Sequence, residues 1–151
     1  MFTLVPSDFF DPASKREALA EVAVIGEESK VEHIEIPNYN AVLVYTVDED
    51  SVVSASVILD IFNRLNECTE YNKILCSIQD DLLYLAVAQG KSLLLANSFK
   101  IQDFTSAQYY IFLSIKSLQI NPEMSTICWL SDLNADEEMS LYRYFKSVVR
   151  L

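Results

Sequence analysis

The sequence predicts an α/β fold with a mixed sheet, in which hairpin-linked antiparallel strands are joined to helix crossovers. Short apolar runs alternate with helical patterns along the chain. Three strand patterns follow one another between residues 73 and 98, with only tight turns between them. Because 151 residues favour one domain and can bury a hydrophobic core, we expect a single domain over residues 1–151.

The first third of the chain predicts three strands and one helix. Residues 2–5 form an apolar strand pattern that ends at a Pro-Ser-Asp turn. A helical pattern covers residues 12–24, and Asp11 can cap it. The alternating residues 31–36 suit an edge strand, and the β-branched run 40–47 suits a central strand.

The middle of the chain begins with its clearest helical pattern, which follows acidic residues at 48–50. One apolar stripe marks this helix: Val57, Ile58, Ile61, Phe62 and Leu65. Three strand patterns come next, over residues 73–78, 82–88 and 92–98. Polar residues between them predict two hairpin turns.

The last third predicts a helix over residues 104–118, ended by an Asn-Pro pair, and a strand over residues 125–130. Acidic residues at 132–138 lead into a final helix. That helix is expected to carry the apolar residues Leu141, Tyr142, Phe145, Val148 and Val149. The predicted order is therefore β-α-β-β-α-β-β-β-α-β-α, without a closing strand.

Composition and hydropathy indicate a soluble, cytoplasmic protein. An apolar fraction of 51% argues against disorder. The longest apolar run, residues 82–88, is far shorter than the roughly 20 residues that a membrane-spanning helix needs. Residues 2–5 are too short for a signal-peptide core, so we expect no membrane insertion.

Charge argues against a nucleic-acid partner. The chain has 11 basic and 22 acidic residues, a formal net charge of −11. Such a field repels a phosphate backbone, and no basic patch or arm stands out in the sequence.

Cysteine and histidine usage predicts neither metal nor cofactor. Cys68, Cys76 and Cys128 show no CxxC spacing, and His33 is the single histidine. Zinc sites draw on several closely spaced ligands, so we expect reduced, mostly buried thiols. A Cys–His nucleophile would require His33 beside one of the thiols, and sequence alone does not place them together.

Two acidic clusters, residues 48–50 and 136–138, could be proposed as paired carboxylates for acid–base catalysis. Both stand at predicted helix starts, where negative charge offsets the helix dipole by roughly 0.3–1 kcal/mol per group. This structural role suffices to explain them, and we predict no catalytic residues.

Two stretches resemble a known family. Residues 2–10 (FTLVPSDFF), and residues 94–99 (LLANSF) before an aromatic helix with Tyr109 and Tyr110, resemble uncharacterised bacterial proteins with an actin-like ATPase fold. More distantly, the chain is similar to the actin-like domains of pilus assembly and type II secretion proteins. The resemblance implies a ribonuclease H-like subdomain of the actin/Hsp70/sugar-kinase superfamily.

The resemblance also implies that the chain is incomplete. A full actin-like module has two such subdomains flanking a nucleotide cleft. This chain opens near what looks like the end of the first subdomain, and its predicted elements stop after a helix. We therefore expect a fragment, a partial module or a reduced family member.

In that superfamily, the first hairpin turn of a subdomain holds phosphates, and glycine is needed there for close backbone approach. The matching turn, residues 78–82, has no Gly, Ser or Thr and contains Asp80 and Asp81. The whole chain has two glycines, Gly26 and Gly90, so it has no glycine-rich nucleotide loop. The resemblance thus implies a degenerate, pseudo-nucleotide site.

Tyrosine suggests where the chain could bind protein. Five of its eight tyrosines cluster in the second half: Tyr84, Tyr109, Tyr110, Tyr142 and Tyr144. Those off the predicted apolar stripes, Tyr109 and Tyr144 with Arg143, are the better interface candidates.

The sequence leaves the function unknown, and we expect a non-catalytic domain that binds a protein partner or a second copy of itself. The alternative is ATP binding in the actin-like manner, with the site completed by another chain. A third hypothesis, a small-molecule enzyme, has no residue in the sequence to support it.

Overall fold

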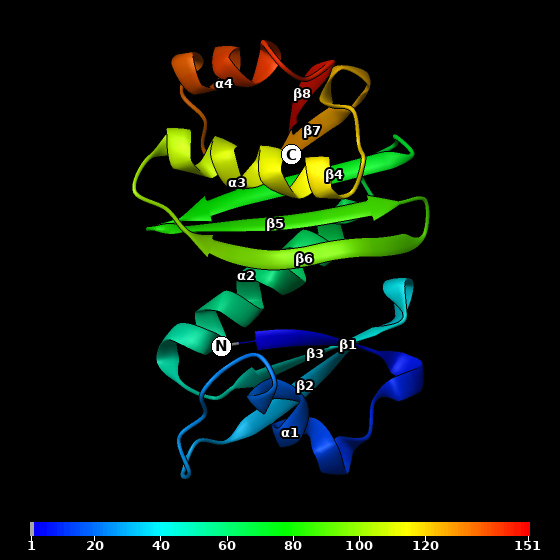
Figure 1. Ribbon diagram of the computed structural model, residues 1–151, viewed down its shortest axis with the longest axis vertical. Helices are drawn as coiled ribbons and strands as arrows, with labels where there is room; N and C mark the ends of the chain where they lie inside the picture. Colours follow the sequence, from blue (N-terminus) through cyan, green and yellow to red (C-terminus); the bar gives the residue numbers. More distant parts are fainter. Residues whose placement is uncertain (1) are drawn as a thin grey trace. The chain divides into compact units, whose positions relative to one another are not determined.

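The structure is a computed structural model that describes residues 2–151, with the side chains of residues 49–54 outside the described part. The chain divides into two compact units (Figure 1), an N-terminal unit over Met1–Asp60 and a C-terminal unit over Ile61–Leu151. The expectation of a single domain over residues 1–151 stays a prediction, and each unit is described by itself.

The N-terminal unit contains a three-stranded antiparallel sheet in the order β1-β3-β2. Its strands are β1 (Phe2–Pro6), β2 (Val31–Ile36) and β3 (Ala41–Thr46). The strand expected to be central, β3, is central and almost entirely buried, and β2 lies at an edge. Both expectations are confirmed. The continuous β-branched run suits a central strand, because its side chains are best buried on both faces of the sheet.

The first helix is shorter than the sequence predicted. Residues 12–14 form a 3-10 turn, and α1 covers only Lys15–Ala20, with Leu19 buried against β2 and β3. Asp11 caps the 3-10 turn by accepting a 3.0 Å hydrogen bond from the Ala13 amide. Beyond the helix, Val22 and Val24 are exposed.

The second helix, α2 (Glu49–Leu65), confirms the clearest helical pattern. The part of α2 in the C-terminal unit buries Ile61, Phe62 and Leu65. An irregular segment over residues 66–71 then leads into the second sheet.

The C-terminal unit contains a five-stranded mixed sheet in the order β6-β5-β4-β7-β8. Its strands are β4 (Asn72–Gln79), β5 (Leu82–Gln89), β6 (Ser92–Lys100), β7 (Thr126–Trp129) and β8 (Ser147–Arg150). The first three are joined as antiparallel hairpins, and β7 and β8 run parallel to β4. The predicted mixed sheet with helix crossovers is confirmed.

Two helices make the crossovers of this sheet (Figure 1): α3 (Phe104–Ser117) between β6 and β7, and α4 (Ala135–Tyr142) between β7 and β8. The predicted final helix was too long, because α4 ends at Tyr142 and a closing strand follows. Val148 and Val149 pair with Ile127 and Cys128 in a parallel ladder. Their β-branched side chains suit that position, and Val148 is buried there.

Candidate functional site

The turn that the resemblance matched to a phosphate loop is the two-residue hairpin between β4 and β5. Gln79 and Leu82 pair across it, which leaves Asp80 and Asp81 as the turn residues. Asp80 has φ = 54°, in the left-handed region that glycine adopts most easily. Gly90 holds the same place in the next hairpin, with φ = 57°.

A shallow hollow of about 220 Å³ lies beside this turn. Four carboxylate side chains line it: Asp80, Asp81, Asp103 and Glu137. The nearest ion pair is a 3.7 Å contact from Lys100 Nζ to Asp81 Oδ2, between two well-exposed side chains. Four carboxylates repel a polyphosphate, so this geometry gives nucleotide binding no support, and that alternative stays a hypothesis.

The acidic cluster at residues 136–138 lies in the first turn of α4, as expected. Glu137 Oε1 accepts from the Asn134 amide at 3.0 Å, while Asn134 Oδ1 accepts from the Glu137 amide at 2.8 Å. Glu138 pairs with Arg150 at 2.6 Å. In the other cluster, Asp48 accepts a 2.6 Å hydrogen bond from the Thr46 hydroxyl, and the side chains of residues 49 and 50 lie outside the described part. Asp48, Glu137 and Glu138 thus have structural partners.

All three cysteines are free and buried, as the sequence predicted. His33 lies in the N-terminal unit, where its ring contacts Phe10 at 4.9 Å between centroids. Cys68 and Cys128 lie in the C-terminal unit, where their thiols contact each other. The contacts of the described residues therefore include no Cys–His pair.

Two absences hold for the part of the chain that the structure describes. No three residues among its His, Cys, Asp and Glu side chains are grouped so that they could hold a metal ion. Its helices are also too short or too polar for any of them to cross a bilayer.

A groove of about 430 Å³ lies at the end of α3 in the C-terminal unit. Its lining comes from α3 and the turn after it: Phe112, Ile115, Lys116, Gln119, Ile120, Asn121 and Pro122. Gln119 has φ = 59°, so the chain reverses there and brings Ile120 back against the helix, where its amide donates to the Ile115 carbonyl at 2.9 Å. We call this feature the α3 groove.

An aromatic side chain from the segment after α4 packs against the α3 groove. Phe112 packs edge-on against Tyr144, which follows α4, with ring centroids 4.9 Å apart. Tyr144 and Leu113 are each about half exposed, at 49% and 50%. A 2.7 Å hydrogen bond from Gln108 Nε2 to Ser140 Oγ holds α3 and α4 together. The groove therefore has a fixed apolar wall.

One basic residue lines the α3 groove, and two others belong to the segment that follows α4. Lys116 lines the α3 groove, and Lys146 lies next to it, because its amide donates to the Pro122 carbonyl at 3.2 Å. Arg143 precedes Tyr144 and is exposed. Among the described side chains, none of these three cations has an ion-pair partner. The α3 groove thus combines an apolar floor with free positive charge.

The structure sorts the predicted interface tyrosines. Tyr109, at 61% exposure, and Tyr144 are at the surface with Arg143, as the off-stripe positions indicated, whereas Tyr84 is buried in β5. Sequence reasoning missed the groove residues Ile120 and Pro122. The Asn-Pro pair predicted the end of the helix. The sequence did not predict the turn that brings the chain back against α3 and forms the groove.

The order and pairing of the five strands and the two crossovers define an actin-like ATPase fold. A solved protein from Bacteroides thetaiotaomicron, described as having an actin-like ATPase fold and unknown function, matches with a TM-score of 0.81 and 19% sequence identity. The match covers 99% of this chain, which spans only 64% of that protein. The expected fold class is confirmed.

The chain belongs to the family DUF3822, described as a protein of unknown function, which matches residues 1–148. The sequence-based expectation of an uncharacterised family with an actin-like fold is therefore confirmed. None of the curated proteins matches this chain.

Proposed function

We propose that this protein is an interaction module whose α3 groove binds an apolar protein segment flanked by acidic residues. The observation that carries the proposal is the coincidence of an apolar groove and three unpaired cations on a strongly acidic chain. Apolar grooves with a charged rim are typical of protein-binding surfaces.

Charge is distributed unevenly between the two units. Residues 1–60 contain three basic and twelve acidic side chains, a formal charge of −9. Residues 61–151 contain eight basic and ten acidic side chains. Residues 112–124 and 143–146 contain one acidic residue, Glu123, and three basic residues, Lys116, Arg143 and Lys146. The α3 groove is therefore locally positive, and it attracts an acidic partner.

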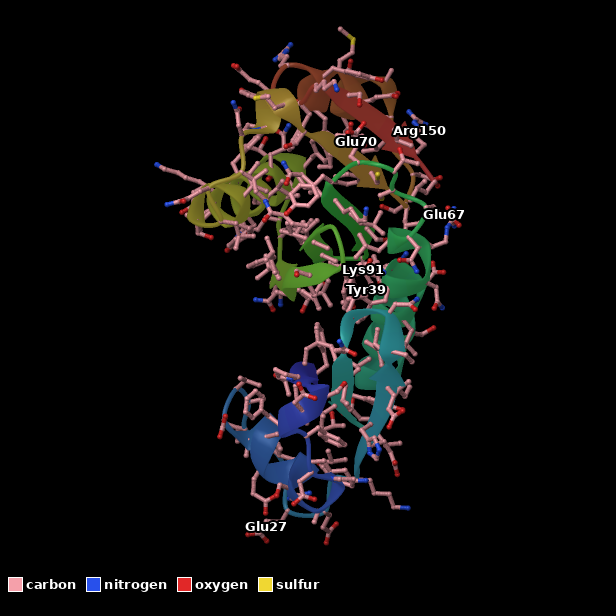
Figure 2. The ribbon with its side chains drawn as sticks, turned by 90° about the vertical axis from the view of Figure 1, so that its right-hand side faces the viewer. Glu27, Tyr39, Glu67, Glu70, Lys91 and Arg150 are labelled. Atoms are coloured by element: carbon pink, nitrogen blue, oxygen red, sulfur yellow. The ribbon has the colours of Figure 1, made fainter. Side chains whose placement is uncertain are left out.

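The chain itself supplies a segment of that chemistry, and we take the occupant to be residues 21–28 of a second copy. Val22 and Val24 are 63% and 87% exposed, and the segment also contains Glu21, Glu27 and Glu28. Figure 2 shows Glu27 extending away from the N-terminal unit into solvent.

Residues 21–28 are held in place by the preceding helix. The Arg16 guanidinium donates to the Ser29 carbonyl at 2.6 Å and to the Gly26 carbonyl. A segment that is already ordered loses less conformational freedom on binding. The N-terminal unit thus presents two exposed valines between acids at little entropic cost.

Such a contact joins different surfaces of two copies, so association is head to tail. Sedimentation velocity over a concentration series is expected to show reversible association that weakens as salt increases. A chain that stays monomeric up to about 1 mM, where binding free energy is only about −4 kcal/mol, overturns the proposal.

Charge reversal localises the interface. Lys116→Glu is expected to weaken association about fivefold to tenfold, because it replaces an attraction with a repulsion. Lys91→Glu makes the same charge change at an exposed position in the β5–β6 turn (Figure 2) and is the matched control. Equal weakening by both variants would show that net charge, and not the α3 groove, controls association.

A charge swap tests the occupant. Glu27→Lys alone is expected to weaken association, and combining it with Lys116→Glu is expected to restore most of the loss. If the double variant is no better than the single ones while association persists, the groove binds some other segment.

The localisation of the protein, its source and the absence of a nucleic-acid partner are further proposals. We infer a cytoplasmic, bacterial protein, because three free thiols fit a reducing compartment and the solved relative is bacterial. We also infer that nucleic acid is not a partner, since the net charge of −11 repels it.

A further inference from the structure

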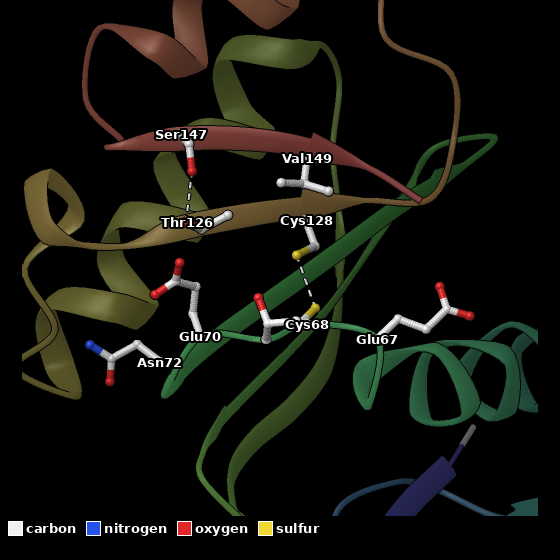
Figure 3. Close-up of a pocket in the computed structure, with 9 residues that line it drawn as sticks. Glu67, Cys68, Glu70, Asn72, Thr126, Cys128, Ser147 and Val149 are labelled. Atoms are coloured by element: carbon white, nitrogen blue, oxygen red, sulfur yellow. Dashed lines mark hydrogen bonds between the residues drawn. The ribbon is translucent and has the colours of Figure 1, made fainter.

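Two cysteines that lie 60 positions apart in sequence meet in the C-terminal unit (Figure 3). Cys68 lies in the irregular segment after α2, and Cys128 lies in β7. Their Sγ atoms are 2.9 Å apart and hydrogen-bonded, and both thiols are free. A disulfide bond is about 2.05 Å long, so roughly 0.9 Å of approach would join them.

A small pocket of about 110 Å³ opens beside the thiol pair. Besides the two cysteines and Val149, the residues that line the pocket are polar (Figure 3): Glu67, Thr69, Glu70, Asn72, Thr126 and Ser147. A water molecule occupies about 30 Å³, so the pocket has room for roughly three or four groups of that size. It can admit a small oxidant and is too small to enclose a bulky one.

The two sulfurs are not equivalent. The hydrogen bond to Cys128 lowers the pKa of Cys68, and the positive charge of Lys73 lowers it further. Lys73 is held nearby, because its ammonium donates to the Cys68 carbonyl at 3.0 Å. The same thiol–thiol contact raises the pKa of Cys128. Cys68 is therefore the sulfur that more readily becomes a thiolate, the nucleophilic form.

We propose that Cys68 and Cys128 form a redox modification site that a small uncharged peroxide converts into an intramolecular disulfide. The proposal rests on the distance between the sulfurs, on the size of the pocket and on the polar lining that can hold a peroxide. It is independent of the proposed function of the α3 groove.

The chemistry is a two-electron oxidation. The Cys68 thiolate attacks one peroxide oxygen, the O–O bond breaks, and the departing hydroxide takes a proton to become water. The Cys128 sulfur then attacks the Cys68 sulfenic acid, and its thiol proton leaves with the sulfenic oxygen as a second water. One hydrogen peroxide and two thiols thus give one disulfide and two waters.

The bond would tie the irregular segment over residues 66–71 to the sheet. Five of those six residues are exposed, and Cys68 is the buried one. Closing a loop of about 60 residues restricts the unfolded chain. The oxidised protein is therefore expected to unfold roughly 5–10 °C higher than the reduced one, reversibly with dithiothreitol.

The test treats reduced protein with hydrogen peroxide and counts free thiols after denaturation. The count is expected to fall from three to one, and peptide mapping is expected to link Cys68 to Cys128. Glutathione disulfide, which is too large for the pocket, is expected to react at least about tenfold more slowly. Three surviving thiols after peroxide treatment, or a disulfide that includes Cys76, would overturn the proposal.

Cysteine variants test which of the two sulfurs is the nucleophile. Cys128→Ser is expected to stop at a Cys68 sulfenic acid that dimedone traps, and Cys68→Ser is expected to give none. Cys76→Ser is the matched control, since Cys76 is buried in β4 and is expected to leave disulfide formation unchanged. Dimedone labelling of Cys128 in the Cys68→Ser protein would reverse the assignment of the nucleophile. Mapping of the wild-type chain decides the proposal even if a variant fails to fold.

Discussion

Trp129 and Ser131 connect the buried core of the C-terminal unit to the end of its sheet. The Trp129 indole, 1% exposed, donates from Nε1 to the Ser131 hydroxyl oxygen at 2.9 Å. The same oxygen accepts from the Ile78 amide at 2.8 Å, at the end of β4. One hydroxyl therefore satisfies two donors from different strands.

Ser131→Ala is expected to destabilise the protein by about 1–3 kcal/mol, because it leaves the indole N–H and a strand amide without an acceptor. Chemical denaturation followed by the fluorescence of Trp129, the single tryptophan, measures the change. Ser92→Ala at the exposed start of β6 is the control and is expected to alter stability by less than about 0.5 kcal/mol. Similar stabilities for the two variants would show that the Ser131 hydroxyl does not support the core.

The reciprocal capping box at the start of α4 predicts a second effect. Asn134→Ala removes the acceptor for the Glu137 amide and is expected to cost about 1 kcal/mol. Asn134→Asp keeps an acceptor and adds a charge that the helix dipole favours, so it is expected to match or exceed the wild type. Thermal unfolding of the three proteins under one set of conditions gives the comparison. Equal stability of the alanine and aspartate variants would contradict the role of the cap.

Asp103 at the start of α3 predicts a pH dependence. The Ser106 amide donates to its carboxylate at 2.8 Å, and this hydrogen bond, with that from the Ser106 hydroxyl, lowers the pKa of Asp103. A lowered folded-state pKa means that the charged form stabilises the fold at pH values above the ordinary value of about 4. That contribution is lost as the pH falls through the lower, folded-state pKa.

The measurement is the difference in unfolding free energy between the wild type and Asp103→Asn at a series of pH values. Asparagine can accept the same hydrogen bond without titrating, so the advantage of the wild type is expected to shrink only below about pH 4. A difference that stays constant from pH 7 to pH 2 would show that the Asp103 charge does not contribute.

Mg-ATP tests the carboxylate-lined turn at Asp80 and Asp81. Because these side chains repel phosphate, no shift in unfolding temperature is expected. Binding at one hundred times Kd would stabilise by about 2.7 kcal/mol, which corresponds to roughly 5–10 °C. If a shift occurs, replacing both aspartates tests whether the nucleotide lies at this turn. A shift that disappears in that variant would make nucleotide binding the first choice of function.

The local patterns of this chain predicted its strands well and its helix ends poorly. The three hairpin strands between residues 72 and 100 lie where alternation and turn residues placed them. The first and last helices are shorter than predicted, since apolar residues spaced as in a helix also fit a loop or a strand. Val148 and Val149 belong to a strand because β7 offers them an open edge, and no local pattern contains that information.

By itself, the sequence determined the alternation of strands and helices, the strong negative charge and the lack of a glycine-rich phosphate loop. These properties depend on residue types and short spacings. Only the tertiary structure decided that Cys68 meets Cys128, that Lys116 and Lys146 flank one apolar groove, and that one hydroxyl serves Trp129 and Ile78. Each of these contacts joins residues far apart in the chain, and strand order and helix crossovers, not local spacing, bring such residues together.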